Sequence, residues 1–254
     1  MKIGVVGVGN MGYAIYKVLS IQYEVIAYDP YKASTLKDVK FEDNQYDVYN
    51  EMDIIILCVK PGQILELVKN IPEKKTILSI AAGISWKNLK DASRQNSVVR
   101  LMPNLPLKIF MGCIAYFGDR EAYPIVRELF GKLGMIVQMD SDSQMDAFTG
   151  LAGSGPAFVF EFLQSLAEGG VKSGLTYPDA LRISLQTIKG SIALMERELE
   201  KNPEAHPEAY KNKVTSPGGT TIHGISAMEK GNFRYSVMDA VYSAYLRASE
   251  IGKK

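Results

Sequence analysis

Three glycines that follow a short apolar stretch at the start of the chain narrow the possible folds more than any other feature. Lys2–Val6 is rich in β-branched residues and predicts a strand, and the glycines follow directly as G-V-G-N-M-G from Gly7 to Gly12. Apolar residues then recur at helical spacing from Ala14 to Leu19. In such a unit the first glycine makes the turn, the second (Gly9) lets the backbone approach a pyrophosphate, and the third lets the helix pack on the strand. The order of elements therefore predicts dinucleotide binding.

An acidic residue ends the second predicted strand. The stretch Glu24–Tyr28 is followed by Asp29, whose carboxylate stands where it can accept hydrogen bonds from the adenosine ribose. A carboxylate there repels a 2′-phosphate and favours NADH, whereas Lys32, three residues later, can offset that repulsion for NADPH. The alternative is that Asp29, which precedes Pro30, is only a turn residue. The sequence leaves the choice of cofactor open and leans to NADH.

Further strand patterns alternate with helical ones up to residue 140. They lie at residues 53–59, 76–80, 98–102, 112–117 and 136–139, with a helix expected at 123–133. This alternation predicts an α/β fold with a doubly wound, mainly parallel sheet.

The residues that follow these strands are candidate cofactor contacts, because the carboxyl ends of parallel strands face the cofactor crevice. Val59, Lys60 and Pro61 follow one strand, Ala81 follows the next, and Asn104 follows the one after that. Lys60 can equally be a solvated loop lysine. Asn104 is either a turn residue or a partner for the nicotinamide amide.

After residue 140 the strand patterns stop and helical patterns continue to residue 250, which predicts a dinucleotide-binding domain at 1–140 and an all-helical domain at 141–254. A helix opened by Pro156 is apolar almost all round and is expected to be buried. Residues 177–199 carry an apolar stripe at heptad-like spacing, and the short domain offers little to cover it. We therefore expect a partner subunit on this stripe, with packing inside the chain as the alternative.

Composition excludes several classes of partner. The chain has 254 residues, is 46% hydrophobic and carries a formal net charge of +1, so it offers neither a basic field for nucleic acid nor a polybasic patch for a membrane surface. Its cysteines, Cys58 and Cys113, do not make a disulfide framework and suit a reducing compartment. The strand that opens the sequence leaves no room for a signal or transit peptide, and no apolar run approaches membrane-spanning length. We expect a cytoplasmic protein.

The helical half contains one motif suited to binding an anion, V-T-S-P-G-G-T-T-I-H-G from Val214 to Gly224. Ser216 is expected to cap a helix, Pro217 to take its first position, and Gly218 and Gly219 to leave the backbone bare. Unpaired N–H groups at the helix start would hold a small carboxylate or phosphate over Gly219 and Thr220, with the Thr221 hydroxyl beside it. The alternative is an ordinary capped helix entered through a Pro-Gly turn.

The residues available for chemistry point to the cofactor as its source. His206 and His223 stand alone, and no residues have metal-ligand spacing, so we expect no metal. Hydride transfer then remains, with the protein supplying position and electrostatics. Reduction of a ketone usually needs a strong general acid, whereas an imine nitrogen is basic enough to be protonated near neutrality. The cradle with Thr221 fits an imine, because its amides hold a carboxylate while the hydroxyl reaches the ring nitrogen.

Five motifs together resemble the pyrroline-5-carboxylate reductase family. They are G-V-G-N-M-G from Gly7, V-K-P from Val59, M-P-N from Met102, G-L-A-G-S-G-P from Gly150, and V-T-S-P-G-G-T-T from Val214. The resemblance implies a Rossmann domain followed by a helical domain that interlocks with a second subunit, giving a homodimer or a larger ring. It also implies reduction of 1-pyrroline-5-carboxylate to L-proline with NADPH or NADH, the last step of proline synthesis.

The resemblance also implies roles for individual residues. In the cradle, Ser216, Gly218, Gly219 and Thr220 would bind the substrate carboxylate, Thr221 would face the ring nitrogen, Val214 would touch the ring, and Glu204 would lie near the nitrogen. The cofactor contacts that it implies are Gly7, Asn10, Met11, Gly12, Val59, Lys60, Pro61 and Asn104. Two positions depart from the family pattern: Leu105 replaces a threonine that often follows Pro-Asn, and Asp29 with Pro30 speaks against NADPH.

Two other functions remain open from the sequence. A β-hydroxyacid dehydrogenase would need a catalytic lysine near the nicotinamide, for which Lys172 is the candidate. A protein that senses or scaffolds through NAD(P)H without turnover would be expected to have a damaged cradle, and here Ser216, Gly218, Gly219 and Thr221 are all present.

Overall fold

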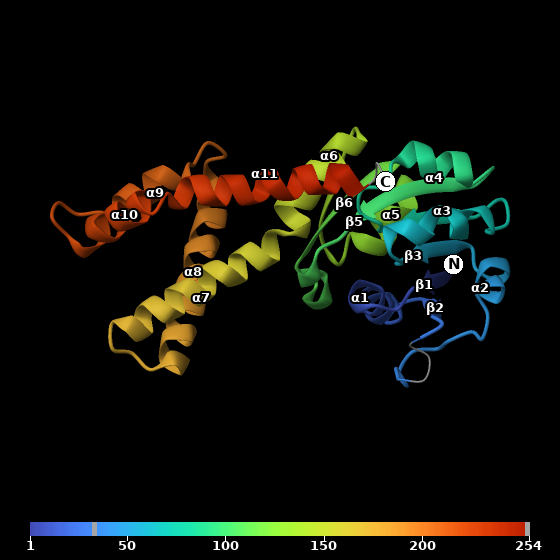
Figure 1. The fold of residues 1–254 in the computed structure, drawn as a ribbon, viewed down its shortest axis with the longest axis horizontal. Helices are drawn as coiled ribbons and strands as arrows, with labels where there is room; N and C mark the ends of the chain where they lie inside the picture. Colours follow the sequence, from blue (N-terminus) through green and yellow to red (C-terminus); the bar gives the residue numbers. More distant parts are fainter. Residues whose placement is uncertain (32–34, 252–254) are drawn as a thin grey trace. The chain divides into compact units, whose positions relative to one another are not determined.

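The computed structural model describes residues 1–31 and 35–251 (Figure 1). Lys32, which the sequence analysis weighed as a counterion for a 2′-phosphate, lies outside the described residues.

The first part of the described chain forms a seven-stranded sheet in the order β2-β1-β3-β4-β5-β6-β7. Its strands are β1 (Lys2–Val6), β2 (Glu24–Tyr28), β3 (Ile54–Leu57), β4 (Thr76–Ser79), β5 (Ser97–Met102), β6 (Gly112–Gly118) and β7 (Gly134–Gln138). Neighbouring strands are parallel except β5 and β6. The order reverses between β1 and β3, which confirms the predicted doubly wound, mainly parallel sheet.

Helices follow most strands and then take over the chain. In the first part they are α1 (Asn10–Leu19), α2 (Gln45–Glu51), α3 (Pro61–Lys69), α4 (Trp86–Ala92), α5 (Tyr123–Phe130) and α6 (Asp142–Phe148). The later helices are α7 (Gly155–Lys172), α8 (Tyr177–Lys201), α9 (Pro207–Lys213), α10 (Thr220–Lys230) and α11 (Phe233–Ile251). Short 3-10 segments occur at η1 (Leu105–Ile109) and η2 (Arg120–Ala122), and a π-helical turn, η3 (Thr149–Gly153), joins α6 to α7.

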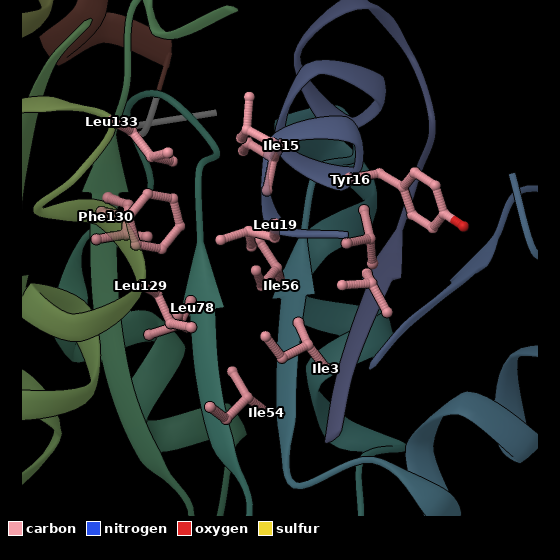
Figure 2. Close-up of a cluster of buried hydrophobic side chains, with 14 of the residues drawn as sticks. Ile3, Ile15, Tyr16, Leu19, Ile54, Ile56, Leu78, Leu129, Phe130 and Leu133 are labelled. Carbon is pink, nitrogen blue, oxygen red and sulfur yellow. The ribbon is translucent and has the colours of Figure 1, made fainter. Parts of the chain in front are cut away.

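Helices cover both faces of the sheet, because alternate strand residues point to opposite sides. Ile54 and Ile56 pack with α1 and α5, as Figure 2 shows for Ile15, Leu19 and Phe130. Their neighbours in β3, Ile55 and Leu57, belong to the other core cluster, together with side chains of α2, α3 and α4. Two-sided burial explains why β3 is a continuous apolar run in the sequence.

The chain divides into two compact units. The first comprises Met1–Pro156 and the C-terminal stretch from Val241, and the second comprises Ala157–Ala240. In the first unit the C-terminal part of α11 lies against η3, since a side chain at Gly150 would meet the backbone of Val241 and Tyr245.

The helical unit leaves most of its apolar side chains exposed. Among its described residues only Ala167, Ala180 and Ser184 are buried. The expectation that the helix after Pro156 is buried is therefore wrong for a single chain, since Phe160 is 58% exposed. On α8, Ile192 is 56% exposed, and Leu185 and Leu199 of the same stripe are exposed too.

A membrane-crossing helix is not found in the described part of the chain, where every helix is too short or too polar. Cys58 and Cys113 are free thiols.

Candidate dinucleotide and anion sites

The loop between β1 and α1 is shaped to receive a pyrophosphate. Gly7 has a φ of 91°, which favours glycine, and a side chain at Gly12 would overlap the Gly7 carbonyl oxygen. Gly9 takes the N-cap position of α1, and no described atom beyond its own chain neighbours lies within 4 Å of where its Cβ would be. The first N–H groups of α1 have no partner within the helix, so they are free for an anion that approaches over Gly9. Gly7 thus makes the turn and Gly12 permits the close approach, as their spacing predicted, while the role of Gly9 toward a pyrophosphate stays a prediction.

The segment after β3 lies against this loop. A side chain at Gly7 would come within 2.9 Å of the Val59 side chain and 2.8 Å of the Cys58 carbonyl oxygen. Lys60 then caps α3, and Pro61 occupies its first turn. The ends of β1 and β3 flank the point where the strand order reverses, which is where doubly wound sheets bind nucleotides. Burial raises the pKa of the Cys58 thiol, so this cysteine stays protonated beside the loop.

Asp29 joins the end of β2 to the glycine loop. One carboxylate oxygen accepts a hydrogen bond from the Val8 N–H at 2.7 Å, and the other accepts from the Tyr31 N–H at 2.9 Å. The second bond is the turn role that the sequence left open. The bond to Val8 was not foreseen, although it follows from the pairing of β1 with β2. It places the carboxylate beside the dinucleotide loop.

Asn104 lies at the carboxyl end of β5, 8% exposed. Its Oδ1 accepts from the Cys113 N–H at 2.8 Å, and its Nδ2 donates to the Ala152 carbonyl oxygen at 3.1 Å. The carboxamide therefore bridges two segments of the protein, a role that neither sequence interpretation included. Ala81 is buried after β4, and its N–H donates to the Ser79 hydroxyl at 3.3 Å.

One buried charged residue escaped the sequence analysis. Arg100 in β5 is 2% exposed, and its guanidinium bonds the carboxylates of Asp142 and Asp146 in α6. Asp142 also accepts from the Trp86 N–H at 2.9 Å. An arginine inside an otherwise apolar strand was the available signal, because such a charge needs buried partners.

The anion cradle begins one turn later than expected. The Gly219 N–H donates to the Ser216 carbonyl oxygen at 3.1 Å, and Gly218 has a φ of 67°. A right-handed helix cannot continue through that φ, so the expectation that Ser216 caps the helix and Pro217 opens it is wrong. Pro217 instead occupies a β-turn, Gly219 takes the N-cap position of α10, and Thr220 is the first helical residue.

The cradle nevertheless keeps its donors. The N–H groups of Thr220 and Thr221 open the helix and have no partner within it, and Gly219 has no side chain to cap them. A Cβ at Gly219 would clash with the Ser216 hydroxyl oxygen, so that hydroxyl lies directly over the bare backbone. Thr221 is half-buried, whereas Val214 is exposed. Two backbone donors and the Ser216 hydroxyl therefore converge at one helix start.

Helix α9 supports the cradle from the preceding side. The Thr215 hydroxyl donates to the Lys211 carbonyl oxygen at 2.8 Å, which ties the start of the motif to α9. The Tyr210 hydroxyl donates to Glu198 of α8 at 2.7 Å, and this bond lowers the pKa of the Glu198 carboxyl. Arg234 of α11 donates to Glu208 at 2.7 Å. The pKa of Glu208 is lowered chiefly by its bond with Lys211.

The remaining candidate residues belong to other segments of the helical unit. Glu204 is exposed in the connector between α8 and α9, and its N–H donates to Asn202 Oδ1 at 3.1 Å. His206 caps α9 by accepting from the Glu208 N–H at 3.3 Å. Lys172 is exposed in the last turn of α7. Within residues 1–31 and 35–251, no group of three His, Cys, Asp or Glu residues could hold a metal ion.

Comparison with known proteins decides the family. Residues 142–251 match the family model for pyrroline-5-carboxylate reductase dimerisation, and residues 2–83 match that for NADP oxidoreductase, coenzyme F420-dependent. The pyrroline-5-carboxylate reductase of Synechocystis sp. is 32% identical over 100% of this chain and 99% of its own. The chain belongs to the pyrroline-5-carboxylate reductase family.

Solved structures agree with this family membership. The pyrroline carboxylate reductase of Plasmodium falciparum, solved with NADP bound, superposes with a TM-score of 0.90 at 29% identity over 99% of this chain and 98% of that one. The 1-pyrroline-5-carboxylate reductase of Streptococcus pyogenes gives a TM-score of 0.89 at 31% identity over 98% of each chain. The pyrroline-5-carboxylate reductase fold thus spans the sheet and the helices. The dimerisation model covers α8 and its exposed stripe, which confirms the expected self-association.

Proposed function

We infer that this chain reduces 1-pyrroline-5-carboxylate to L-proline, with NADPH or NADH as hydride donor, in the last step of proline biosynthesis. The observation that carries this inference is the helix start at Ser216–Thr221, where N–H groups and a hydroxyl converge in a member of this reductase family. The open glycine loop supports the dinucleotide part, because its free N–H groups and bare Gly9 fit a pyrophosphate.

The residues of the cradle would hold the substrate by its carboxylate. The N–H groups of Thr220 and Thr221 and the Ser216 hydroxyl donate to the carboxylate oxygens, and the dipole of α10 adds to the attraction. Gly218 permits the turn, and Gly219 leaves space for the anion. Val214 is the proposed contact to the ring, and Glu204 is proposed to lie near the ring nitrogen. Both residues are exposed.

The Thr221 hydroxyl would orient the ring nitrogen. The bound cofactor supplies a hydride to the carbon of the C=N bond, and the nitrogen keeps the proton that makes it an amine. Since the imine is protonated before the hydride arrives, no strong acid is required and one oriented hydroxyl suffices.

The dinucleotide contacts are proposed at three places. They are the loop residues Gly7, Gly9, Asn10, Met11 and Gly12, the carboxylate of Asp29, and the strand ends at Val59, Lys60, Pro61 and Ala81. Asn104 is not kept as a direct contact, because both ends of its carboxamide bond the protein. Because Asp29 holds a negative charge against the Val8 N–H, we propose that NADH is preferred over NADPH. Free cysteines support a cytoplasmic location. We keep residues 1–140 and 141–254 as the functional domains and a homodimer or larger ring as the assembly.

The test is the loss of NADH or NADPH absorbance with 1-pyrroline-5-carboxylate, at equal cofactor concentrations, with L-proline as the measured product. Rapid oxidation with stoichiometric L-proline is expected. Binding of both cofactors without oxidation would contradict the inference and favour a sensing protein. Oxidation of a hydroxy acid that depends on Lys172 would favour a β-hydroxyacid dehydrogenase.

A further inference from the structure

The G-L-A-G-S-G-P motif from Gly150 has no role in the reaction described so far, yet its backbone is unusual. Thr149–Gly153 forms a π-helical turn, in which the Ser154 N–H donates to the Thr149 carbonyl oxygen at 2.9 Å. Such turns are rare and concentrate at functional sites. The turn connects α6 to α7 and therefore needs contacts that fix it.

The sequence of the motif leaves one of its carbonyls without the usual partner. In an α-helix the Ala152 carbonyl would accept from the residue four positions later, which is Pro156. Proline has no N–H, so that bond cannot form. Asn104 supplies the donor instead, through its Nδ2 at 3.1 Å.

The other end of the Asn104 carboxamide is fixed as well. Its Oδ1 accepts from the Cys113 N–H at 2.8 Å, at the start of β6. Because the side chain is 8% exposed and bonded at both ends, its orientation is set. The π-helical turn is thereby held at a fixed distance from the ends of β5 and β6.

Strand β5 contacts the same segment at two further points. Arg100, buried in β5, bonds Asp142 and Asp146, which share one face of α6 at a spacing of four residues. Met102 lies between Arg100 and Asn104 on the same side of the strand and packs with Met145 and Phe148 of α6. One strand therefore fixes the whole run from α6 through the π-helical turn.

The end of β5 belongs to the edge of the sheet that faces the dinucleotide crevice. We propose that Asn104 is a positioning residue for hydride transfer: by donating to the Ala152 carbonyl it fixes the π-helical turn Thr149–Gly153 beside the nicotinamide end of the site. This proposal rests on the proposed function. The role differs from a direct contact with the nicotinamide amide, because both ends of the Asn104 side chain already bond the protein.

The variant Asn104→Asp tests this role selectively. It keeps an oxygen for the Cys113 N–H but replaces the donor to Ala152 with a second oxygen. Asn70→Asp is the matched control, because Asn70 Nδ2 donates to the helical carbonyl of Glu66 at 3.0 Å on the surface of α3. In the full-length protein we expect N104D to lower kcat about 10- to 100-fold while the Kd for NADH and the KM for the imine stay within about twofold. N70D should match the wild type.

A compensating substitution gives the second measurement. Pro156→Ala restores an N–H four residues after Ala152, so it should return part of the turnover lost in Asn104→Ala, while P156A alone stays near the wild type. Hydrogen exchange adds a readout that does not depend on turnover: amides of residues 149–155, Ser154 among them, should exchange about tenfold faster in N104D than in N70D.

The outcomes separate the proposal from its alternatives. A kcat in N104D within twofold of the wild type would overturn it. So would a rise in the Kd for NADH that matches the loss of turnover, since Asn104 would then touch the dinucleotide. If the wild type did not turn over the imine, the proposed function would be wrong. Faster amide exchange in N104D would then still show that Asn104 fixes the π-helical turn. Equal exchange rates in N104D and N70D would show that Asn104 does not fix the π-helical turn.

Discussion

The hydroxyl of Thr221 is the group that the proposed chemistry uses to orient the ring nitrogen. Replacing Thr221 by Ala keeps the backbone N–H that binds the carboxylate and removes the hydroxyl together with the γ-methyl group. We expect kcat to fall about 10²-fold, as for the loss of one oriented hydrogen-bonding group, with the KM for 1-pyrroline-5-carboxylate little changed. Steady-state kinetics check this, with Thr221→Ser as the variant that should retain activity. Equal turnover in T221A and the wild type would remove this residue from the mechanism.

At the same scale, Asp29 combines a structural bond with a charge. Asp29→Asn keeps an oxygen for the Val8 N–H and removes the negative charge that repels a 2′-phosphate. The ratio of kcat/KM for NADPH over NADH should therefore rise about tenfold or more. Asp38→Asn is the control, because Asp38 bonds Tyr13 and Lys17 on the surface. An unchanged ratio would show that another residue governs cofactor choice.

Among the elements, the start of α10 allows a sharp test of the cradle. A Cβ at Gly219 would clash with the Ser216 hydroxyl oxygen, so Gly219→Ala should displace the hydroxyl and narrow the anion site. We expect the KM for the substrate to rise about tenfold or more, with cofactor binding unchanged. Gly224→Ala is the matched control, since its added Cβ meets no described atom within 4 Å other than the neighbouring backbone of α10. It should stabilise α10 by about 0.5–1 kcal/mol. A KM in G219A equal to that of G224A would contradict the cradle.

The sequence predicts some of these elements better than others. The loop at Gly7–Gly12 was predictable, because its spacing, flanking strand and helix all require one geometry. The start of α10 was placed too early, since Ser-Pro fits both a helix start and a β-turn, and the φ of Gly218 decides between them. The bridges made by Asn104 and Arg100 were not predictable, because they join positions 48 and 42 residues apart in the chain. Contacts between residues so far apart in the sequence form only in the folded chain.

For the whole molecule, the helical unit depends on association, since Ala167, Ala180 and Ser184 are the buried residues among those described there. A charge at Ile192, 56% exposed on the α8 stripe, should therefore break the contact with a second copy. We expect Ile192→Lys to lower the mass measured by sedimentation equilibrium and to lower the unfolding midpoint in a way that depends on protein concentration. Gln186→Lys, an exposed polar position on the same helix, should change neither. If I192K kept the wild-type mass, the stripe would not be the interface. The apolar side chains of α7 and α11 would then have to make the contact by themselves.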